Sequence, residues 1–476
     1  MKSSNEYKTI YLMGIGGIAM GTLAGMLKDS GYEVLGSDQN LYPPMSTHLE
    51  SLGIPLFQGY RAENLRVRSV DLVIVGNVIR RENPEAQAVL EDGIPHMSMP
   101  QAIAHFFLGD HQSMVVAGTH GKSTTSSLLG WILAQGGMDP SVFVGAFLNN
   151  WAASYRLGKG PFMVLEGDEY DTAFFDKGPK FLHYRPKLGI ITSVEFDHAD
   201  IFPNLESIVE AFRAFVRLIP SDGHLILNGD DPICRMLARE CGGSVVTYGR
   251  SEHADWRILD RDCDQGRASC VYFDPVRGER RKLVTSLMGR HNLGNALAAV
   301  VAATLAGVSE HDIRESLVSF RGVKRRQDWV GNVRGIRVMD DFAHHPTAVS
   351  ETLLAVRECH PEARLIAAFE PRTNSSRRKV FQEDYATAFK VADVICVKSP
   401  PGLESIPEPE RLDAAKLVRD IARGGRDAHL FEGTDLLIRF LSDFCGPGDL
   451  VVCMSNGSFD GLPHRLTEAL RNRTPV

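Results

Sequence analysis

The chain has 476 residues, which at roughly 150 residues per domain predicts about three domains. Hydrophobic residues make up 43% and charged residues 23%, and the formal net charge is −7. A nucleic-acid coat and a membrane-surface role both need a basic excess, so neither is expected. No apolar stretch approaches the roughly 20 residues of a membrane span. The start MKSSNEYKTI lacks the pattern of a secretory signal, so we expect a cytoplasmic protein. The eight cysteines lack zinc spacing, and we expect free thiols.

The first block, residues 1–111, has the pattern of a Rossmann-like α/β domain. A strand over Tyr7–Met13 leads into GIGGIAMG and a helix that reaches about Ser30. Further strands are expected at Tyr32–Leu35, which leads to Asp38, and at Asp71–Val75. The glycines fit a dinucleotide fingerprint, and they fit equally any diphosphate held on a helix N-terminus, including that of a UDP-sugar.

The second block, residues 112–320, carries a phosphate-binding loop. A strand over Met114–Ala117 precedes AGTHGKST, and a helix over Ser123–Gln135 follows it. Backbone N–H groups of such a loop cradle phosphates, Lys122 would reach the β- and γ-phosphates, and the Ser123 hydroxyl would bind Mg²⁺. The loop is one residue tighter than the general P-loop pattern, because its first glycine is Gly118.

Carboxylates gather after two further strands of this block, expected at Phe162–Leu165 and Leu188–Thr192. LEGDEYD follows the first of these strands and EFDHAD follows the second. Since the carboxyl ends of parallel strands converge on a ligand crevice, Glu166 and His198 are candidate metal ligands. The alternative is a solvated acid and an ordinary hydrogen-bonded histidine. A helix with two asparagines near its start is expected over Gly289–Gly307.

The third block, residues 321–476, alternates strands and helices as a second doubly wound α/β domain does. The basic cluster VKRRQD near its start is either a solvated linker or the source of an arginine that completes a phosphate site when domains close. His344 and His345 lack further ligands at metal spacing, so polar contacts to nucleotide or substrate are favoured. Strands are expected at Ile336–Met339, Leu365–Phe369, Val394–Val397 and Leu450–Met454, helices at Pro346–Cys359, Arg378–Lys390, Leu412–Ala422 and Asp435–Phe444, and a surface loop at Ser399–Glu410.

Taken together, the motifs resemble those of the Mur ligases, ATP-dependent enzymes that form amide bonds in peptidoglycan precursors. GIGGIAM, GTHGKST, EFDHAD, HNLGN, KRRQD and DDFAHHPT occur in the order of that family, and the tightened loop is the family's own form. GIGG, GSD, GTHGK and HHP look most like the branch that adds L-alanine to UDP-N-acetylmuramate. SDQNLYPPMSTHLE, EYDTAFFDKGPKFLHY, EFDHADIF, EPRTNS and MSNGSF look more like the branch that re-attaches a tripeptide during peptidoglycan recycling, which we favour.

The resemblance implies a fold and a reaction. Three domains would bind UDP-N-acetylmuramate, ATP with Mg²⁺, and the tripeptide L-Ala-γ-D-Glu-meso-diaminopimelate, without nucleic acid, membrane or an obligate protein partner. ATP would phosphorylate the lactyl carboxylate, and the alanyl amine would attack the acyl phosphate. Lys122 and Arg326 would be catalytic. The ATP-binding set would be Gly118, Thr119, His120, Gly121, Lys122, Ser123, Thr124, Asn292, Asn295, Arg326 and Asp341; the metal ligands Ser123, Glu166 and His198; and the substrate-binding set Gly14, Gly16, Gly17, Asp38, His344, Arg372, Asn374, Ser455 and Asn456.

Two functions from other classes compete with this interpretation. A nicotinamide-dependent oxidoreductase would explain GIGGIAMG and Asp38, but it leaves GTHGKST without a role. A nucleotide-binding switch module would explain the loop, but not an arginine and an aspartate that arrive from a separate domain. Within the ligase class, L-alanine remains the alternative amine.

Overall fold

The computed structural model describes residues 6–41, 45–264 and 266–473. The first five residues of the segment tested for a secretory signal, and residues 42–44 of SDQNLYPPMSTHLE, lie outside this part of the chain. The described chain forms two compact units. The first comprises Met1–Glu195, Glu206–Trp256 and Ala298–Ser316, and the second comprises Phe196–Leu205, Arg257–Leu297 and Leu317–Val476. None of the helices in the described residues has the length and apolar character needed to cross a bilayer.

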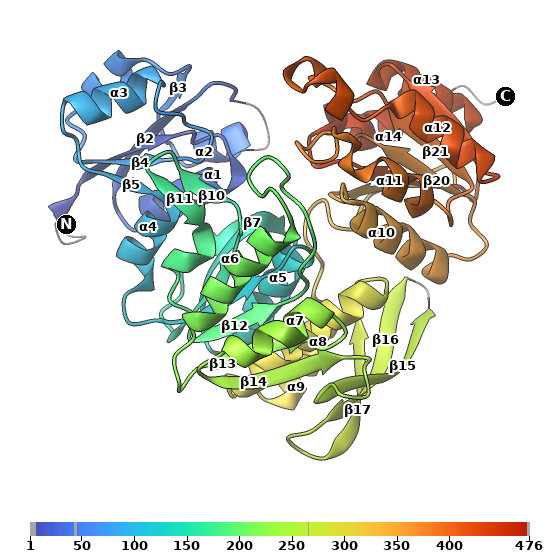
Figure 1. The fold of residues 1–476 in the computed structure, drawn as a ribbon, viewed down its shortest axis with the longest axis horizontal. Helices are drawn as coiled ribbons and strands as arrows, with labels where there is room; N and C mark the ends of the chain where they lie inside the picture. The colour runs from blue at the N-terminus through green and yellow to red at the C-terminus, as the bar shows by residue number, and fades with distance from the viewer. Residues whose placement is uncertain (1–5, 42–44, 265, 474–476) are drawn as a thin grey trace. The chain divides into compact units, whose positions relative to one another are not determined.

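The N-terminal part of the first unit is a five-stranded parallel sheet in the order β3-β2-β1-β4-β5 (Figure 1). The central strands β1 and β4 are buried along their whole length, as expected for a parallel sheet covered on both faces. The strand predicted from Tyr7 begins two residues later. The strands are β1 Thr9–Met13, β2 Glu33–Asp38, β3 Leu56–Gln58, β4 Leu72–Val75 and β5 His96–Ser98, and the helices are α1 Ile18–Asp29, α2 Met45–Ser51, α3 Pro84–Glu91 and α4 Met99–Ile103.

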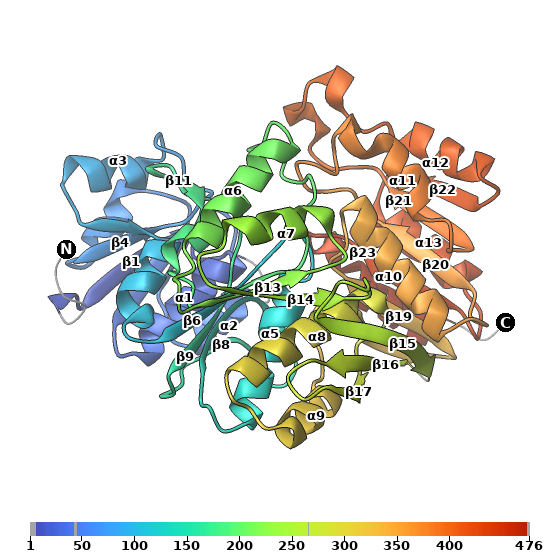
Figure 2. The ribbon, with the colours of Figure 1, turned by 60° about the horizontal axis from the view of Figure 1, so that its bottom comes forward.

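Seven strands of a larger, ten-stranded sheet follow in the same unit, in the order β14-β13-β12-β6-β9-β7-β8, and of these seven only β8 is antiparallel to its neighbour. Helix α5 covers one face, while α6 and α7 cover the other (Figure 2). The strands are β6 Gln112–Ala117, β7 Ser141–Leu148, β8 Ala153–Arg156, β9 Phe162–Glu166, β12 Leu188–Ile191, β13 His224–Asn228 and β14 Ser244–Gly249; the helices are α5 Lys122–Gln135, α6 Leu205–Arg217 and α7 Pro232–Leu237; and β10 Asp171–Ala173 pairs with β11 Asp176–Pro179.

Helix α1 joins the two sheets of the first unit. The hydroxyls of Thr22 and Ser154 lie 2.7 Å apart in a buried hydrogen bond. Gly25 lies so close to the ring of Tyr155 that a Cβ there would be 2.7 Å from a ring carbon. The small residues of α1 therefore allow the helix to pack directly on β7 and β8.

The second unit contains an antiparallel meander, and the chain continues through helices α8 Arg290–Leu305 and α9 Glu310–Ser319, each of which contributes residues to both units. The meander consists of β15 Trp256–Asp264, β16 Arg267–Asp274 and β17 Glu279–Thr285.

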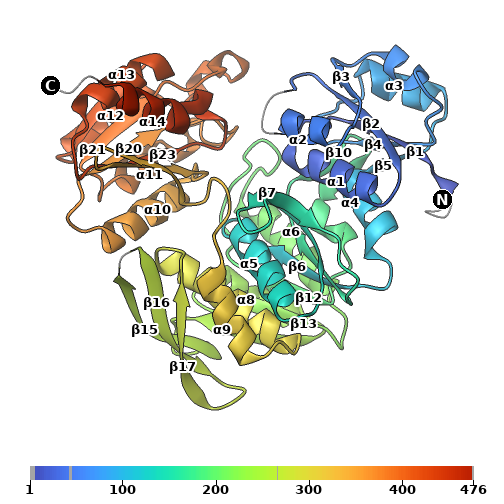
Figure 3. The ribbon, with the colours of Figure 1, turned by 180° about the vertical axis from the view of Figure 1, so that it is seen from behind.

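A third sheet completes the second unit, with the order β18-β19-β23-β20-β21-β22 and only β18 antiparallel (Figure 3). In β20, Leu365, Ala367 and Phe369 pack under α10, α11 and α12, whereas Ile366 and Ala368 pack under α13 and α14. The strands are β18 Asp328–Val333, β19 Ile336–Asp341, β20 Leu365–Phe369, β21 Val394–Lys398, β22 Asp427–Phe431 and β23 Leu450–Met454, and the helices are α10 Pro346–Cys359, α11 Gln382–Ala388, α12 Ala414–Arg423, α13 Thr434–Phe444 and α14 Leu462–Asn472.

Two expectations about this unit are wrong. The helix expected over Arg378–Lys390 is shorter, because Arg378 is extended and forms an isolated β-bridge with Arg411. A 3₁₀ turn therefore precedes α11. The expectation of free thiols fails for Cys263 and Cys359, which form a disulfide across 96 residues of sequence. Such a pair has no spacing signal, since tertiary packing of β15 against α10 brings the two sulfurs together.

Candidate active site

The phosphate-binding loop lies between β6 and α5, as the sequence predicts. Gly118 has a φ of +129°, and a Cβ there would lie 2.2 Å from the hydroxyl oxygen of Thr192, so glycine is required. Gly121 is also left-handed and caps α5. The N–H of Thr119 donates to the carbonyl of Ser193 at 2.9 Å, which fixes the loop against the segment after β12.

The Lys122 side chain lies against this loop and is 12% exposed. It donates to the carbonyl of Gly118 at 2.6 Å and to the Glu169 carboxylate at 2.8 Å. Burial alone would lower the pKa of Lys122, but Glu169 and two neighbouring carboxylates outweigh burial and raise it. Lys122 is therefore a fixed positive charge beside a set of oriented backbone groups, an arrangement suited to phosphate.

Glu166, the last residue of β9, and Ser123, in the first turn of α5, form the oxygen pair expected for a hard cation. The Ser123 hydroxyl donates to Oε1 of Glu166 at 2.9 Å, and the N–H of Gly145 donates to Oε2 at 2.8 Å. Both side chains offer oxygen ligands next to Lys122, and such oxygens are the donors that Mg²⁺ prefers. The pair therefore fits the predicted metal.

His198 belongs to the second unit, where its backbone is left-handed with a φ of +54°. Its loop is held from two sides: the N–H of Ala199 donates to the hydroxyl of Ser375 at 3.1 Å, and His345 Nε2 lies 3.1 Å from the carbonyl of Phe196. Because His345 Nδ1 accepts from the N–H of Thr347, its Nε2 is the protonated nitrogen. His345 thus positions the segment that carries His198.

Asp197, the residue before His198, adds a buried negative charge to this segment. Burial alone would raise the pKa of Asp197, but His198, His344 and His345 lower it well below its usual range. Burial lowers the pKa of His344 to about 4, so that ring is neutral at neutral pH and its Nδ1 donates to the carbonyl of Phe342.

Gln327 connects the asparagines of α8 with Asp341, a residue expected from the third block. Asn292 Nδ2 donates to Gln327 Oε1 at 3.2 Å and Asn295 donates to Asn292 at 3.1 Å. The N–H of Gln327 donates to Asp341 at 2.8 Å. Arg326 lies with its guanidinium 4.6 Å from the centre of the Phe342 ring. The basic cluster is therefore anchored to the end of β19 and is not a solvated linker.

The glycine turn of the first sheet is held by its own carboxylate. Asp38 Oδ2 accepts from the N–H of Gly16 at 2.9 Å, and the N–H of the left-handed Gly14 donates to the carbonyl of Ser37 at 2.8 Å. Gly17 caps α1 without a side chain of its own. Ser37 in turn donates to the fully buried Glu85 at 2.6 Å. The turn is thus prearranged in front of a helix N-terminus, which suits an anionic group.

At the carboxyl ends of β20, β21 and β23 lies a cluster of charged side chains that we call the third-sheet cluster: Glu370, Arg372, Lys398, Ser455 and Asp460. Glu370 is fully buried and accepts from Lys398 at 2.8 Å and from Ser455 at 2.7 Å. Lys398 also donates to Asp460 at 2.5 Å, and Arg372 lies 3.8 Å from Glu370. Arg372 is 41% exposed, so its guanidinium is available to an anion.

The neighbouring amides have different surroundings. Asn374 donates to Asp200 at 2.9 Å and accepts from Arg377 at 2.9 Å, so both ends of its amide are engaged. Asn456 Oδ1 is buried without a hydrogen-bond partner among the described residues. Arg377 also donates to the carbonyls of Pro401 and Gly402, which gives it a structural role.

Sequence reasoning missed several residues of these sites. Glu370 directly follows β20 and Lys398 ends β21, so the rule that ligands meet strand carboxyl ends would have found both. Glu169 lies in a segment that the sequence singled out, but not as the partner of Lys122. Gln327 and Glu85 act through contacts that only the folded chain creates.

Comparison with known proteins gives three family matches. Residues 9–111 match the model described as Mur ligase family, catalytic domain; residues 116–303 match Mur ligase middle domain; and residues 325–457 match Mur ligase, glutamate ligase domain. Each of the three sheets lies largely within one of these segments.

Several relatives match over nearly the whole chain. An Escherichia coli protein named UDP-N-acetylmuramate–L-alanyl-gamma-D-glutamyl-meso-2,6-diaminoheptandioate ligase is 39% identical over 467 residues, 98% of each chain. A Rhizobium etli UDP-N-acetylmuramate–L-alanine ligase is 34% identical, over 96% of each chain. The crystal structure of a murein peptide ligase from Psychrobacter arcticus is 32% identical, covers 98% of this chain and 100% of its own, and superposes with a TM-score of 0.74.

Proposed function

As the chain belongs to the Mur ligase family and has its three α/β domains, we propose that it joins L-Ala-γ-D-Glu-meso-diaminopimelate to the lactyl carboxylate of UDP-N-acetylmuramate, with conversion of ATP to ADP and phosphate. The observation that carries the proposal is the full-length identity of 39% to a ligase named for that tripeptide, against 34% for a ligase named for L-alanine. The product would return to peptidoglycan synthesis, in the cytoplasm.

The reaction needs ATP because a carboxylate is a poor electrophile. A carboxylate oxygen attacks the γ-phosphorus, ADP leaves, and the alanyl amine then attacks the acyl carbon. The carbon–oxygen bond of the acyl phosphate breaks, phosphate departs and the amine loses a proton. The protein's contribution to such a reaction is mainly positioning and charge neutralisation.

The phosphates of ATP would lie on the loop Gly118–Thr124, with Lys122 against the transferred phosphoryl group. Ser123 and Glu166 would hold Mg²⁺, and His198 would contribute a further ligand from its loop. A bound Mg²⁺ would neutralise charge on the phosphate oxygens. Asn292 and Asn295 would bind the adenine side.

Arg326 and Asp341 would act together from the third domain. Asp341 accepts the N–H of Gln327, and so fixes the residue beside Arg326. The stacked Phe342 ring restricts the guanidinium further. A preoriented arginine stabilises transferring phosphoryl groups better than a mobile one, because less entropy is lost on binding.

UDP-N-acetylmuramate would bind at the glycine turn of the first sheet. The N-terminus of α1, with Gly14, Gly16 and Gly17 before it, would receive the diphosphate. Asp38 would fix the turn through the N–H of Gly16, which it already accepts at 2.9 Å.

The tripeptide would bind at the third-sheet cluster, with contributions from His344, Asn374 and Asn456. It carries carboxylates that L-alanine lacks, and a half-exposed arginine grips a carboxylate with two parallel hydrogen bonds. The buried Glu370 and Lys398 pair supports this arrangement, because it leaves Arg372 with a defined neighbour and an open face. We therefore assign carboxylate recognition to Arg372 and its orientation to Glu370.

An isotope experiment tests the reaction. UDP-N-acetylmuramate labelled with ¹⁸O in both oxygens of the lactyl carboxylate is incubated with ATP and the tripeptide, and the released phosphate is analysed by mass spectrometry. The acyl-phosphate route places one labelled oxygen in each phosphate. Unlabelled phosphate, formed at the same rate without the tripeptide, would show that the protein only hydrolyses ATP.

A further inference from the structure

The disulfide between Cys263 and Cys359 connects two different domains. Cys263 lies in β15, within the segment that matches the middle domain, and Cys359 is the last residue of α10, within the segment that matches the C-terminal domain. Both belong to the second compact unit, and their Cα atoms lie 5.3 Å apart. The bond therefore ties the end of a C-terminal-domain helix to the middle-domain meander.

Two ion pairs follow the same line along α10. Arg261 of β15 donates to Glu358 at 2.9 Å, next to the disulfide. About two helical turns before Glu358, Glu351 accepts at 2.9 Å from Nε of Arg290, which is the first residue of α8. Helix α8 also carries Asn292, the proposed adenine contact. Met288, just before α8, also belongs to the same buried cluster as Val349, Leu353 and Val356 of α10, and the covalent link adds to these non-covalent contacts.

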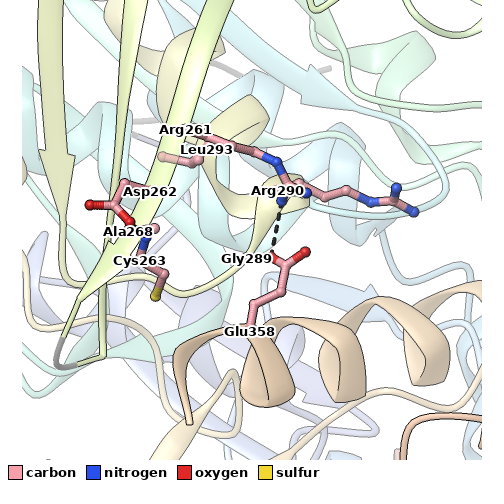
Figure 4. Close-up of a pocket in the computed structure, with 8 residues that line it drawn as sticks. All are labelled: Arg261, Asp262, Cys263, Ala268, Gly289, Arg290, Leu293 and Glu358. Atoms are coloured by element: carbon pink, nitrogen blue, oxygen red, sulfur yellow. Dashed lines mark hydrogen bonds and ion pairs between the residues drawn. The ribbon is translucent and has the colours of Figure 1, made fainter. Parts of the chain in front are cut away.

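The disulfide is accessible from a pocket. A cavity of about 300 Å³ lies between the meander, the start of α8 and the end of α10 (Figure 4). Cys263 lines it, whereas Cys359 is only 7% exposed. The cavity is lined by Arg261, Asp262, Cys263, Ala268, Gly289, Arg290, Leu293 and Glu358.

We propose that Cys263 and Cys359 form a reversible thiol–disulfide modification site that controls movement of the C-terminal domain against the middle-domain meander. Disulfides in reducing compartments are usually transient and regulatory. Cys263, which opens into the pocket, is the sulfur that exchanges with small thiols and disulfides. The buried Cys359 is its resolving partner.

The exchange uses a low-molecular-weight disulfide as oxidant. The Cys263 thiolate attacks one sulfur of that disulfide, which releases one small thiol and leaves a mixed disulfide. The Cys359 thiolate then attacks the sulfur of Cys263 and releases the second small thiol. Two protein thiols thus lose two electrons and two protons, and one small disulfide becomes two thiols. A small dithiol reverses both steps.

The effect of the disulfide on the mobility of α10 does not depend on the proposed ligase activity. Its effect on turnover rests on that proposed activity. With the bond closed, α10 stays against β15 and α8. With the bond open, the ion pairs, the hydrogen bond between Asn292 and Gln327 and the buried packing around Met288 restrain the C-terminal domain without a covalent link. If turnover requires the C-terminal domain to move, closure of the disulfide slows turnover. Couplings of this kind change the affected quantity by about 5- to 150-fold.

The test compares the full-length protein after treatment with glutathione disulfide and after treatment with dithiothreitol. Peptide mapping without reduction should find the Cys263–Cys359 link in the first sample and two free thiols in the second. Hydrogen exchange in β15 and in the last turn of α10 should be faster in the reduced protein. Turnover should be at least about fivefold faster in the reduced protein.

Two variants separate this site from general thiol effects. Cys263→Ser should remove the difference in exchange and turnover between the two treatments, whereas Cys241→Ser, at a partly exposed free cysteine, should retain it. Failure to detect the link in the oxidised wild-type protein would overturn the proposal whether or not the protein is a ligase. A link that forms but changes neither exchange nor turnover would make it a passive crosslink and would equally overturn it.

Discussion

Gly457 lies directly against Arg372, and this contact gives a way to move the arginine without removing it. A Cβ at position 457 would lie 2.3 Å from Cδ and 2.5 Å from Nε of Arg372. Ordinary contacts between such atoms are about 3.5 Å, so the side chain must move by about 1 Å. The backbone of Gly457 is outside the left-handed region, so Gly457→Ala places no strain on the main chain. We expect the fold to be unchanged and Arg372 to be displaced.

The proposed role of Arg372 in binding a carboxylate of the tripeptide sets the size of the expected increase in KM. Loss of a hydrogen bond to a charged group is worth about 1.5–3 kcal/mol, or roughly 10- to 150-fold in KM. Steady-state phosphate release should show that increase for the tripeptide and an unchanged KM for UDP-N-acetylmuramate. Gly446→Ala is the control, because a Cβ there meets no atom within 4 Å. The reasoning is refuted if Gly457→Ala still raises the KM for the tripeptide when Arg372 is already alanine, since the two effects should not add.

Three further changes test other parts of the account. Lys122→Ala should reduce turnover by at least about 100-fold in a protein that still folds, because the charge at the transferred phosphoryl group is lost; near-normal turnover would contradict the assignment. Glu166→Gln should raise the Mg²⁺ concentration needed for half-maximal activity, since an amide is a weaker ligand for a hard cation, and an unchanged Mg²⁺ titration would remove Glu166 from the metal site. Burial alone would raise the pKa of Glu351, but the hydrogen bonds and charges of Arg290 and His291 together outweigh burial and lower the pKa from 4.5 to about 2. The ionised form therefore stabilises the fold above pH 4.5, and Glu351→Gln should cost up to about 3 kcal/mol there, a difference that shrinks as the pH falls towards 2 in denaturant titrations; a difference independent of pH would contradict this origin.

The sequence predicted the parts of the site that rest on local chain geometry. The phosphate loop needs glycine at Gly118 and Gly121 for backbone reasons, and a strand and a helix flank it where the hydrophobic pattern places them. The three-domain α/β fold follows from the same periodic signals, and it is confirmed. The proposed domain boundaries and the individual residue roles stay predictions.

Contacts between distant segments could not be read from the sequence. Asn374 and Asp200 are 174 residues apart, and the two bonded cysteines are 96 residues apart, so no spacing rule joins either pair. Lys398 was missed for a smaller reason. The apolar run suggested a strand that stops at Val397, whereas β21 continues through Lys398, whose charge is accommodated by Glu370 and Asp460.

The choice of amine is the central claim, and a competition experiment tests it most directly. Equal concentrations of the tripeptide and L-alanine are supplied together with ATP, Mg²⁺ and UDP-N-acetylmuramate, and the products are identified by mass spectrometry while less than a tenth of the sugar nucleotide has reacted. We expect almost all product to be UDP-N-acetylmuramoyl-tripeptide. Product that is mainly UDP-N-acetylmuramoyl-L-alanine would contradict the proposed substrate and assign the protein to the alanine-adding branch of the family.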